Sequence, residues 1–359
     1  MSFVQRMKRW WQGEPIVATE PAAPPAPGAR RGRVDHVIIL DGTLCTLTPG
    51  QESNAGLVFR LLAEARPVMR RRIYYEPGLQ WEGWRHTVAF LEGRGISRQI
   101  RRAYGWLASQ YREGDQIYLF GYSRGAYAVR SLAGVIDRVG LVRREEATER
   151  AIRQVWRHYR QGPETEAALA FARSYCHADA TVQMVGVWDT VKALGLRLPL
   201  LWMLTEKHTV FHNHQLGRSV RHGFQALALN ETRAVFDPIM WSSPHDWQGN
   251  VEQVWFRGSH GDVGGQVGSF PAARPLANIP LVWMLERAEA AGLELPQGWA
   301  MRYPCDPRSP MMGTTRGWAK VFLLRRPRVV GRHASESVHP TATGVRPFSW
   351  MPWPLTRLF

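Results

Sequence analysis

Residues 116–126 read QIYLFGYSRGA, and this stretch decides the fold. Its first five residues are mostly apolar or aromatic, which is typical of a buried strand. A Gly-Tyr-Ser-Arg-Gly turn follows, and after Ser123 apolar residues recur at helical spacing as far as Gly140, a natural helix stop. A strand, a sharp turn and a helix in this order predict a nucleophile elbow, with Ser123 as the nucleophile.

The two glycines of the turn support this interpretation. A serine in such an elbow has a strained backbone, so the residues two before and two after it must be small. Gly121 and Gly125 stand at these positions. The serine would then lie at a helix N-terminus, where backbone N–H groups stabilise an oxyanion. The alternative is an ordinary exposed serine in a tight strand–helix turn.

The composition is that of a globular protein with an unusual charge. The 359 residues are 45% hydrophobic and 21% charged, which suits one α/β domain with insertions or two smaller domains. There are 46 Lys+Arg against 30 Asp+Glu, a net charge of +16, and 16 tryptophans. Such a surface would attract anionic lipid, nucleic acid or an acidic partner. A basic soluble protein without a special partner is the alternative.

The cysteines and the hydropathy limit the class further. Cys45, Cys176 and Cys305 are far apart and show neither a metal-binding spacing nor a disulfide framework, which suits a reducing compartment. No run of about 18 apolar residues predicts a spanning helix. No apolar core follows the basic residues of 1–12, so we expect no signal peptide. We expect no metal, no cofactor and a location in the cytoplasm of the producing cell.

The chain is expected to have three parts. Residues 1–33 combine a basic, Trp-containing stretch with a Pro/Ala-rich linker. The basic stretch reads as an amphipathic surface helix or as a frayed terminus. Residues 34–325 are expected to form the catalytic domain, and residues 326–359 a Trp/Pro-rich extension docked on the domain or on a membrane interface.

Strand and helix patterns alternate through the predicted domain, which indicates right-handed crossovers and a largely parallel sheet. We therefore predict a three-layer α/β-hydrolase-like fold with helical or loop insertions over the site. A long loop is expected at 78–95, a lid or insertion at 195–220, and a helix at about 222–233. The main strands are expected near 34–40, 72–76, 116–120, 181–188 and 251–256.

Two residues after strands complete a candidate triad with Ser123. Asp189 follows a strand and would share its sheet edge with Ser123, although an Asp at that place is often only a turn or cap residue. His260 lies among glycines in a loop after a later strand, where an imidazole can reach the serine. We assign Ser123 as nucleophile, His260 as general base and then acid, and Asp189 as the residue that orients the imidazole. The order Ser…Asp…His is that of α/β hydrolases. The alternative pair is His339 with Asp262.

The loop Asp41-Gly42-Thr43 follows the first predicted strand of the domain. Backbone N–H groups of Gly42 or Thr43 could form an oxyanion hole together with the N–H of Arg124. Haloacid-dehalogenase-like phosphatases have a similar Asp-Gly-Thr spelling, but Ile39 stands where their nucleophilic Asp is required. That chemistry therefore lacks its key atom here.

Several ordered blocks together resemble a known family. It is the α/β-hydrolase-like family of uncharacterised-domain proteins that includes the type VI secretion phospholipase effectors. The resemblance implies a serine-dependent hydrolase of carboxylic esters, a (phospho)lipase or esterase, with a secretion-apparatus or immunity partner. The blocks are DGT at 41–43, FGYSRGAY at 120–127, GVWDTV at 186–191, ALALNE at 226–231 and WFRGSHGDVGG at 255–265.

Other functions stay open from the sequence. A catalytically degenerate hydrolase scaffold could act as a binding protein. Nucleic-acid binding rests on charge alone, without a recognisable module, so we expect no nucleic acid partner. The basic charge, the tryptophans and the apolar insertion favour acyl esters of anionic lipids as substrates, with peripheral contact to a membrane.

Overall fold

The computed structural model describes residues 15–18, 32–64, 70–78, 94–191, 215–242, 247–315 and 324–344. Four predicted features lie wholly or mostly outside this part of the chain. They are the basic stretch at 1–12, the loop at 78–95, the insertion at 195–220 and the end of the C-terminal extension.

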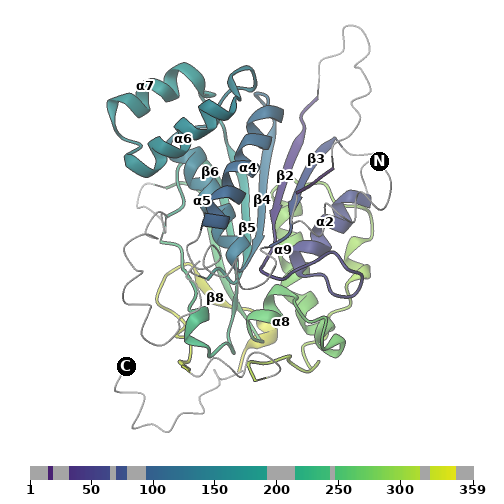
Figure 1. The fold of residues 1–359 in the computed structure, drawn as a ribbon. Coiled ribbons are helices and arrows are strands. Elements are labelled where there is room, and N and C mark those ends of the chain that lie inside the picture. The colour runs from purple at the N-terminus through teal and green to yellow at the C-terminus, as the bar shows by residue number, and fades with distance from the viewer. Residues whose placement is uncertain are drawn as a thin grey trace, which may run out of the picture.

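An eight-stranded sheet forms the centre of the molecule, in the order β1-β3-β2-β4-β5-β6-β7-β8 (Figure 1). All neighbours pair in parallel except β1, which runs antiparallel to β3. The mostly parallel sheet of the prediction is thus confirmed. The strands are β1 (Ile16–Ala18), β2 (Asp35–Leu40), β3 (Arg71–Glu76), β4 (Gln116–Tyr122), β5 (Val182–Trp188), β6 (Val220–Ala228), β7 (Asn250–Phe256) and β8 (Glu336–Val338).

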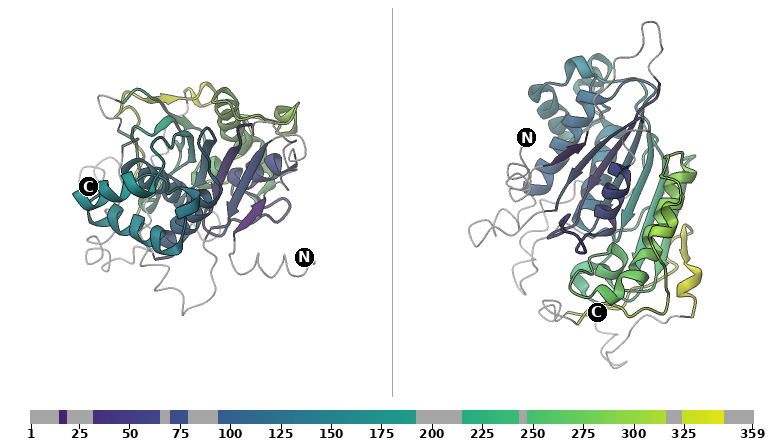
Figure 2. Two further views of the ribbon diagram at one scale, coloured as in Figure 1. Left: turned by 90° about the horizontal axis from the view of Figure 1, so that it is seen from above. Right: turned by 90° about the vertical axis from the view of Figure 1, so that its right-hand side faces the viewer.

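Helices cover both faces of this sheet, which confirms the predicted three layers (Figure 2). One buried cluster joins α4 and α5 to one face, and a second cluster joins α2 and α9 to the other. The helices α6 and α7 lie at the opposite end of the sheet from the short α8 (Figure 1). The helices are α2 (Asn54–Glu64), α4 (Arg94–Gln110), α5 (Arg124–Arg138), α6 (Glu149–Gln161), α7 (Glu166–Tyr175), α8 (His260–Gly264) and α9 (Arg274–Ala290).

The prediction of a helix over 222–233 is wrong, because most of that stretch is strand β6. The run contains Ala, Leu and Gln, which favour helices when judged alone. In the sheet, β6 lies between β5 and β7 and its last six residues are buried. A central parallel strand is covered on both faces and therefore reads as a continuous apolar run rather than an alternating one.

The sheet includes residues from the predicted C-terminal extension. Strand β8 pairs in parallel with β7, and Ser337 stands opposite Val254. Just before it, the isolated bridge between Arg325 and Arg233 ties the chain to the segment after β6. Within the described ranges, no helix is both long and apolar enough to cross a bilayer.

The turn between β4 and α5 is packed directly against the end of β2. A methyl group on Gly125 would lie 2.0 Å from the carbonyl oxygen of Leu40 and 2.5 Å from that of Asp41. One on Gly121 would lie 2.7 Å from the backbone of Ala126. These distances are far inside van der Waals contact, so both glycines are required for the backbone to approach this closely.

We expect Gly125→Ala to lower the free energy of unfolding by about 3 kcal/mol or more, because the clash is with backbone that cannot rotate away. The control is Gly134→Ala on the same helix, whose new methyl would meet the side chain of Tyr159, with the hydroxyl nearest at 3.1 Å, and no backbone among its three nearest atoms. That variant should stay within about 1 kcal/mol of wild type, since alanine favours the helix. Urea denaturation measures both, and equal losses would contradict the packing argument.

Candidate active site

Ser123 lies on the strained turn that the sequence predicts. Strand β4 ends at Tyr122, α5 begins at Arg124, and Ser123 between them has φ 56° and ψ −118°. A positive φ is unusual for a residue with a side chain and is held here by its surroundings. The N–H of Ser123 donates to the carbonyl oxygen of Trp188 at 3.0 Å, which ties the turn to the neighbouring strand β5.

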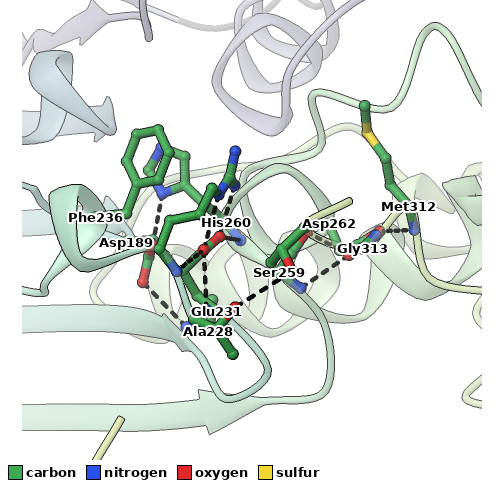
Figure 3. Close-up of polar contacts among 12 residues, drawn as sticks. Asp189, Ala228, Glu231, Phe236, Ser259, His260, Asp262, Met312 and Gly313 are labelled. Carbon is green, nitrogen blue, oxygen red and sulfur yellow. Dashed lines mark hydrogen bonds and ion pairs between the residues drawn. The ribbon is translucent and has the colours of Figure 1, made fainter. Parts of the chain in front are cut away.

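His260 is brought to Ser123 by the turn that follows β7. The hydroxyl of Ser123 lies 2.8 Å from Nε2 of His260. The turn is closed by a capping box, in which Asp262 accepts hydrogen bonds from both the N–H and the hydroxyl of Ser259. The N–H of His260 also donates to Glu231 at 3.0 Å. The imidazole is therefore positioned through its main chain from two sides (Figure 3).

Asp189 completes the row from the far side of the imidazole. Its Oδ2 lies 2.6 Å from Nδ1 of His260, and its Oδ1 accepts from the N–H of Ala228 at 3.0 Å. Asp189 directly follows β5 and has a φ of 43°, the second strained backbone in the site. Serine, imidazole and carboxylate thus lie in one hydrogen-bonded row at the carboxyl edge of the sheet, where open α/β sheets bind ligands.

The carboxylate of Asp189 is held in its ionised form. It is fully buried, and burial alone would raise its pKa. The guanidinium of Arg328 and the hydrogen bond from His260 outweigh burial, so the pKa of Asp189 lies well below its ordinary value. An ionised carboxylate can only accept, so Nδ1 of His260 carries the proton and Nε2 is left to accept the proton of Ser123.

The Asp41-Gly42-Thr43 loop lies beside the serine turn. Asp41 and Gly125 are in contact, and a side chain on Gly42 would meet the ring of Tyr122 at 2.5 Å. The carboxylate of Asp41 accepts from Ser53, Tyr75 and the N–H of Gly42. Of the predicted oxyanion donors, the N–H of Gly42 is therefore already engaged by Asp41. The N–H of Arg124 is at the first residue of α5, and the buried hydroxyl oxygen of Thr43 has no hydrogen-bond partner among the residues that the structure describes.

The alternative pair is not brought together. Nδ1 of His339 lies 2.8 Å from the hydroxyl of Thr341, and its ring stacks on Phe256. The carboxylate of Asp262 instead accepts from Ser259 and from the N–H of Met312. It thus ties α8 to the chain near residue 312 (Figure 3). Within the described residues, no group of three His, Cys, Asp or Glu side chains could hold a metal ion.

Three residues at the site were missed by the sequence reasoning. Arg328 forms an ion pair with Asp189, Glu231 binds the main chain of His260, and the ring of Phe236 stacks on the imidazole at 4.6 Å. Glu231 belongs to the block at 226–231 that carried the resemblance, which was a signal for a role. Arg328 had no such signal, being one of 46 basic residues in a stretch of weak pattern.

A mostly parallel sheet with helices on both faces, and a serine in the turn after β4, place the protein in the α/β-hydrolase-like class. A family model described as the catalytic domain of Tle1-like type VI secretion phospholipase effectors matches residues 35–287. The chain belongs to this family.

The chain is only moderately similar in sequence to an individual relative. The chain is 28% identical over 233 residues to the uncharacterized protein YEL023C of Saccharomyces cerevisiae, covering 57% of this chain and 32% of that protein. It therefore spans about a third of that relative's length.

Three solved structures are similar at low identity. An uncharacterized Pseudomonas aeruginosa protein shares 17% identity, with 76% of this chain and 49% of that one covered and a TM-score of 0.42. The Tle1 effector bound to the VgrG spike of the type VI secretion system shares 18%, with 66% and 52% covered and a TM-score of 0.37. A butyrate-bound thermophilic esterase, Est2 of Thermogutta terrifontis, shares 15%, with 79% and 91% covered and a TM-score of 0.38.

We expect Asp189→Asn to lower the free energy of unfolding at pH 7 by about 3 kcal/mol, because it leaves the buried cation of Arg328 without its counter-charge. The folded-state pKa of Asp189 lies below its ordinary value of 3.8. Its contribution to stability is therefore fully present above about pH 4 and is lost only as the pH falls through the folded pKa. The difference from wild type should stay constant between about pH 5 and 8 and shrink below about pH 4.

Urea denaturation across this pH range measures the effect. The matched control is Asp237→Asn, which removes a carboxylate from the exposed pair with Arg326. That change should cost less than about 1 kcal/mol, as is usual for surface pairs. Equal losses in the two variants, or a difference that already shrinks between pH 7 and 5, would contradict the assignment of Asp189.

Proposed function

We propose that this chain is a serine-dependent hydrolase of carboxylic esters that acts on lipids as a (phospho)lipase or esterase. The observation that carries the proposal is the unbroken row from the hydroxyl of Ser123 through His260 to the carboxylate of Asp189. Each member has the hydrogen-bond role that nucleophilic acyl transfer requires. Membership of a phospholipase effector family points the same way.

In the first half of the reaction, Oγ of Ser123 attacks the ester carbonyl carbon while Nε2 of His260 takes its proton. The imidazolium that forms is stabilised by the ionised Asp189 through Nδ1–H. His260 then gives the proton to the leaving alcohol as the carbonyl re-forms, which leaves an acyl group on Ser123. In the second half, His260 activates water in the same way, and the carboxylic acid and free serine are released.

The negative charge of the tetrahedral intermediate needs donors placed beside Ser123. The N–H of Arg124 is the first proposed donor, because it stands at the N-terminus of α5, where the helix dipole favours an anion. The Thr43 N–H or hydroxyl is the second. Gly42 would first have to release Asp41 before it could contribute.

Lipid is the proposed substrate class because the chain has a net charge of +16, which attracts anionic headgroups. A type VI secretion effector role, with a secretion-apparatus or immunity partner, is proposed from the family.

A hydrolysis assay on a lipid panel tests the proposal. Wild type should release fatty acid from vesicles of phosphatidylglycerol, phosphatidylethanolamine or phosphatidylcholine, or from short-chain nitrophenyl esters. Ser123→Ala should lower kcat by at least about 1000-fold, because no other group can form the acyl-enzyme. A fluorophosphonate probe should label wild type at Ser123 and should not label the variant.

Histidine variants separate the two candidate bases. His260→Ala should be as inactive as Ser123→Ala, since both remove members of one unit. His339→Ala is the control and should retain wild-type kcat, because within the described part of the chain its imidazole hydrogen-bonds only to Thr341 in its own turn. Full activity in His260→Ala would end the proposal. A folded wild type that neither hydrolyses esters nor reacts with the probe would instead favour a degenerate scaffold that binds.

A further inference from the structure

Asp189 has a partner that a Ser-His-Asp row does not require. The side chain of Arg328 donates hydrogen bonds to both oxygens of this carboxylate. Nη1 donates to Oδ1, and Nη2 donates to Oδ2 at 2.9 Å. Its side chain is 3% exposed, and that of Asp189 is fully buried. Arg328 lies 139 residues further along the chain and beyond the residues 35–287 that define the family match.

The same guanidinium also binds the main chain around the histidine. Nη1 donates to the carbonyl oxygen of Ala228 at 2.9 Å, and Nη2 donates to that of Phe236. Ala228 is the residue whose N–H bonds Asp189, and the ring of Phe236 stacks on His260. One planar guanidinium therefore connects the carboxylate, the end of β6 and the main chain of the residue whose ring packs on His260.

This arrangement has an electrostatic consequence for the reaction. Oδ2 of Asp189 accepts from Nδ1–H of His260 and from Arg328 at once. The cation keeps the buried carboxylate ionised, which is the form that His260 requires. It also offsets part of the negative charge of Asp189, so the carboxylate stabilises the imidazolium that forms during catalysis less strongly.

We propose that Arg328 is a positioning residue of the active site, which holds Asp189 ionised and in the orientation that serves His260. This inference rests on the proposed function for its kinetic tests. It makes the segment after residue 324 part of the catalytic apparatus rather than an appendage to it.

Arg328→Lys and Arg328→Ala test the inference, with Arg326→Ala as the matched control. Arg326 is two residues away, and among the described residues its side chain forms only the exposed pair with Asp237. Lysine keeps the charge but cannot make the two parallel bonds. We expect kcat to fall about 10-fold in Arg328→Lys and about 100-fold or more in Arg328→Ala, at nearly unchanged KM, since loss of the aspartate's function costs about 10⁴-fold in related triads. Arg326→Ala should match wild type.

The pH profile gives a readout that a purely structural role would not move. Among the described residues, the titratable and hydroxyl groups that face His260 are Asp189, Ser123, the ring of Tyr122 and, at its main chain, Glu231, and the uncharged ring of Phe236 stacks on it. Without Arg328, the full charge of Asp189 stabilises the imidazolium form more strongly. The acid limb of kcat/KM should therefore move to higher pH in Arg328→Ala and remain in place in Arg326→Ala.

Chemical rescue and proton NMR complete the test. Millimolar guanidinium should restore part of kcat to Arg328→Ala and change nothing in Arg326→Ala. The proton between Nδ1 of His260 and Asp189 should give a downfield resonance in wild type that shifts or disappears in Arg328→Lys. This resonance needs no substrate, so it decides the inference even if wild type hydrolyses no ester and the proposed function fails.

If Arg328→Ala does not fold, the Arg328→Lys variant alone tests the positioning role of Arg328. Wild-type kcat, an unmoved acid limb and an unchanged downfield proton in Arg328→Lys would overturn the inference while leaving the Ser123 mechanism standing. Loss of activity in Arg326→Ala equal to that in Arg328→Ala would overturn it as well. The loss would then come from disturbing the segment around residues 326–328 and not from losing the hydrogen bonds between Arg328 and Asp189.

Discussion

A buried negative charge is the constraint on which the site depends. Asp189 lies at the edge of the sheet with no exposed surface, and a carboxylate in that position is costly unless cations or donors surround it. Here a guanidinium, an imidazole N–H and a backbone N–H together offset the lost hydration. The surrounding structure, from β6 to the chain near residue 328, is arranged to supply those three partners.

The sheet provides the frame in which these groups meet. Ser123 and Asp189 follow the adjacent strands β4 and β5, and His260 follows β7. Parallel strands present their carboxyl ends at one edge, so residues far apart in sequence are brought together without long side chains. The close approach of Gly125 to the carbonyl groups of β2 then fixes the serine turn against the Asp41 loop.

Much of this could be read from sequence, because its signals are local. The apolar run before Gly121 predicts a strand, the glycine spacing predicts the turn, and the order of Ser123, Asp189 and His260 predicts their meeting at one edge. Strand β6 could not be read in this way, since its apolar run is explained by burial between two neighbours, which is a property of the assembled sheet. The role of Arg328 could not be predicted for the same reason. An arginine in a weakly patterned stretch has no local signal, and its role follows only from the carboxylate that the fold places beside it.

The two aromatic rings around His260 have a consequence of their own. Phe236 stacks on one side at 4.6 Å, and Tyr122 lies tilted at 4.9 Å. An imidazole that packs against two aromatic rings in this way cannot swing out or flip its ring without displacing its neighbours. In the mechanism proposed above, the proton passes between nucleophile, leaving group and water while the ring stays nearly still. On that proposal, little energy is spent on reorganising the base between the two halves of a turnover, and substrates must bring their oxygen atoms to it.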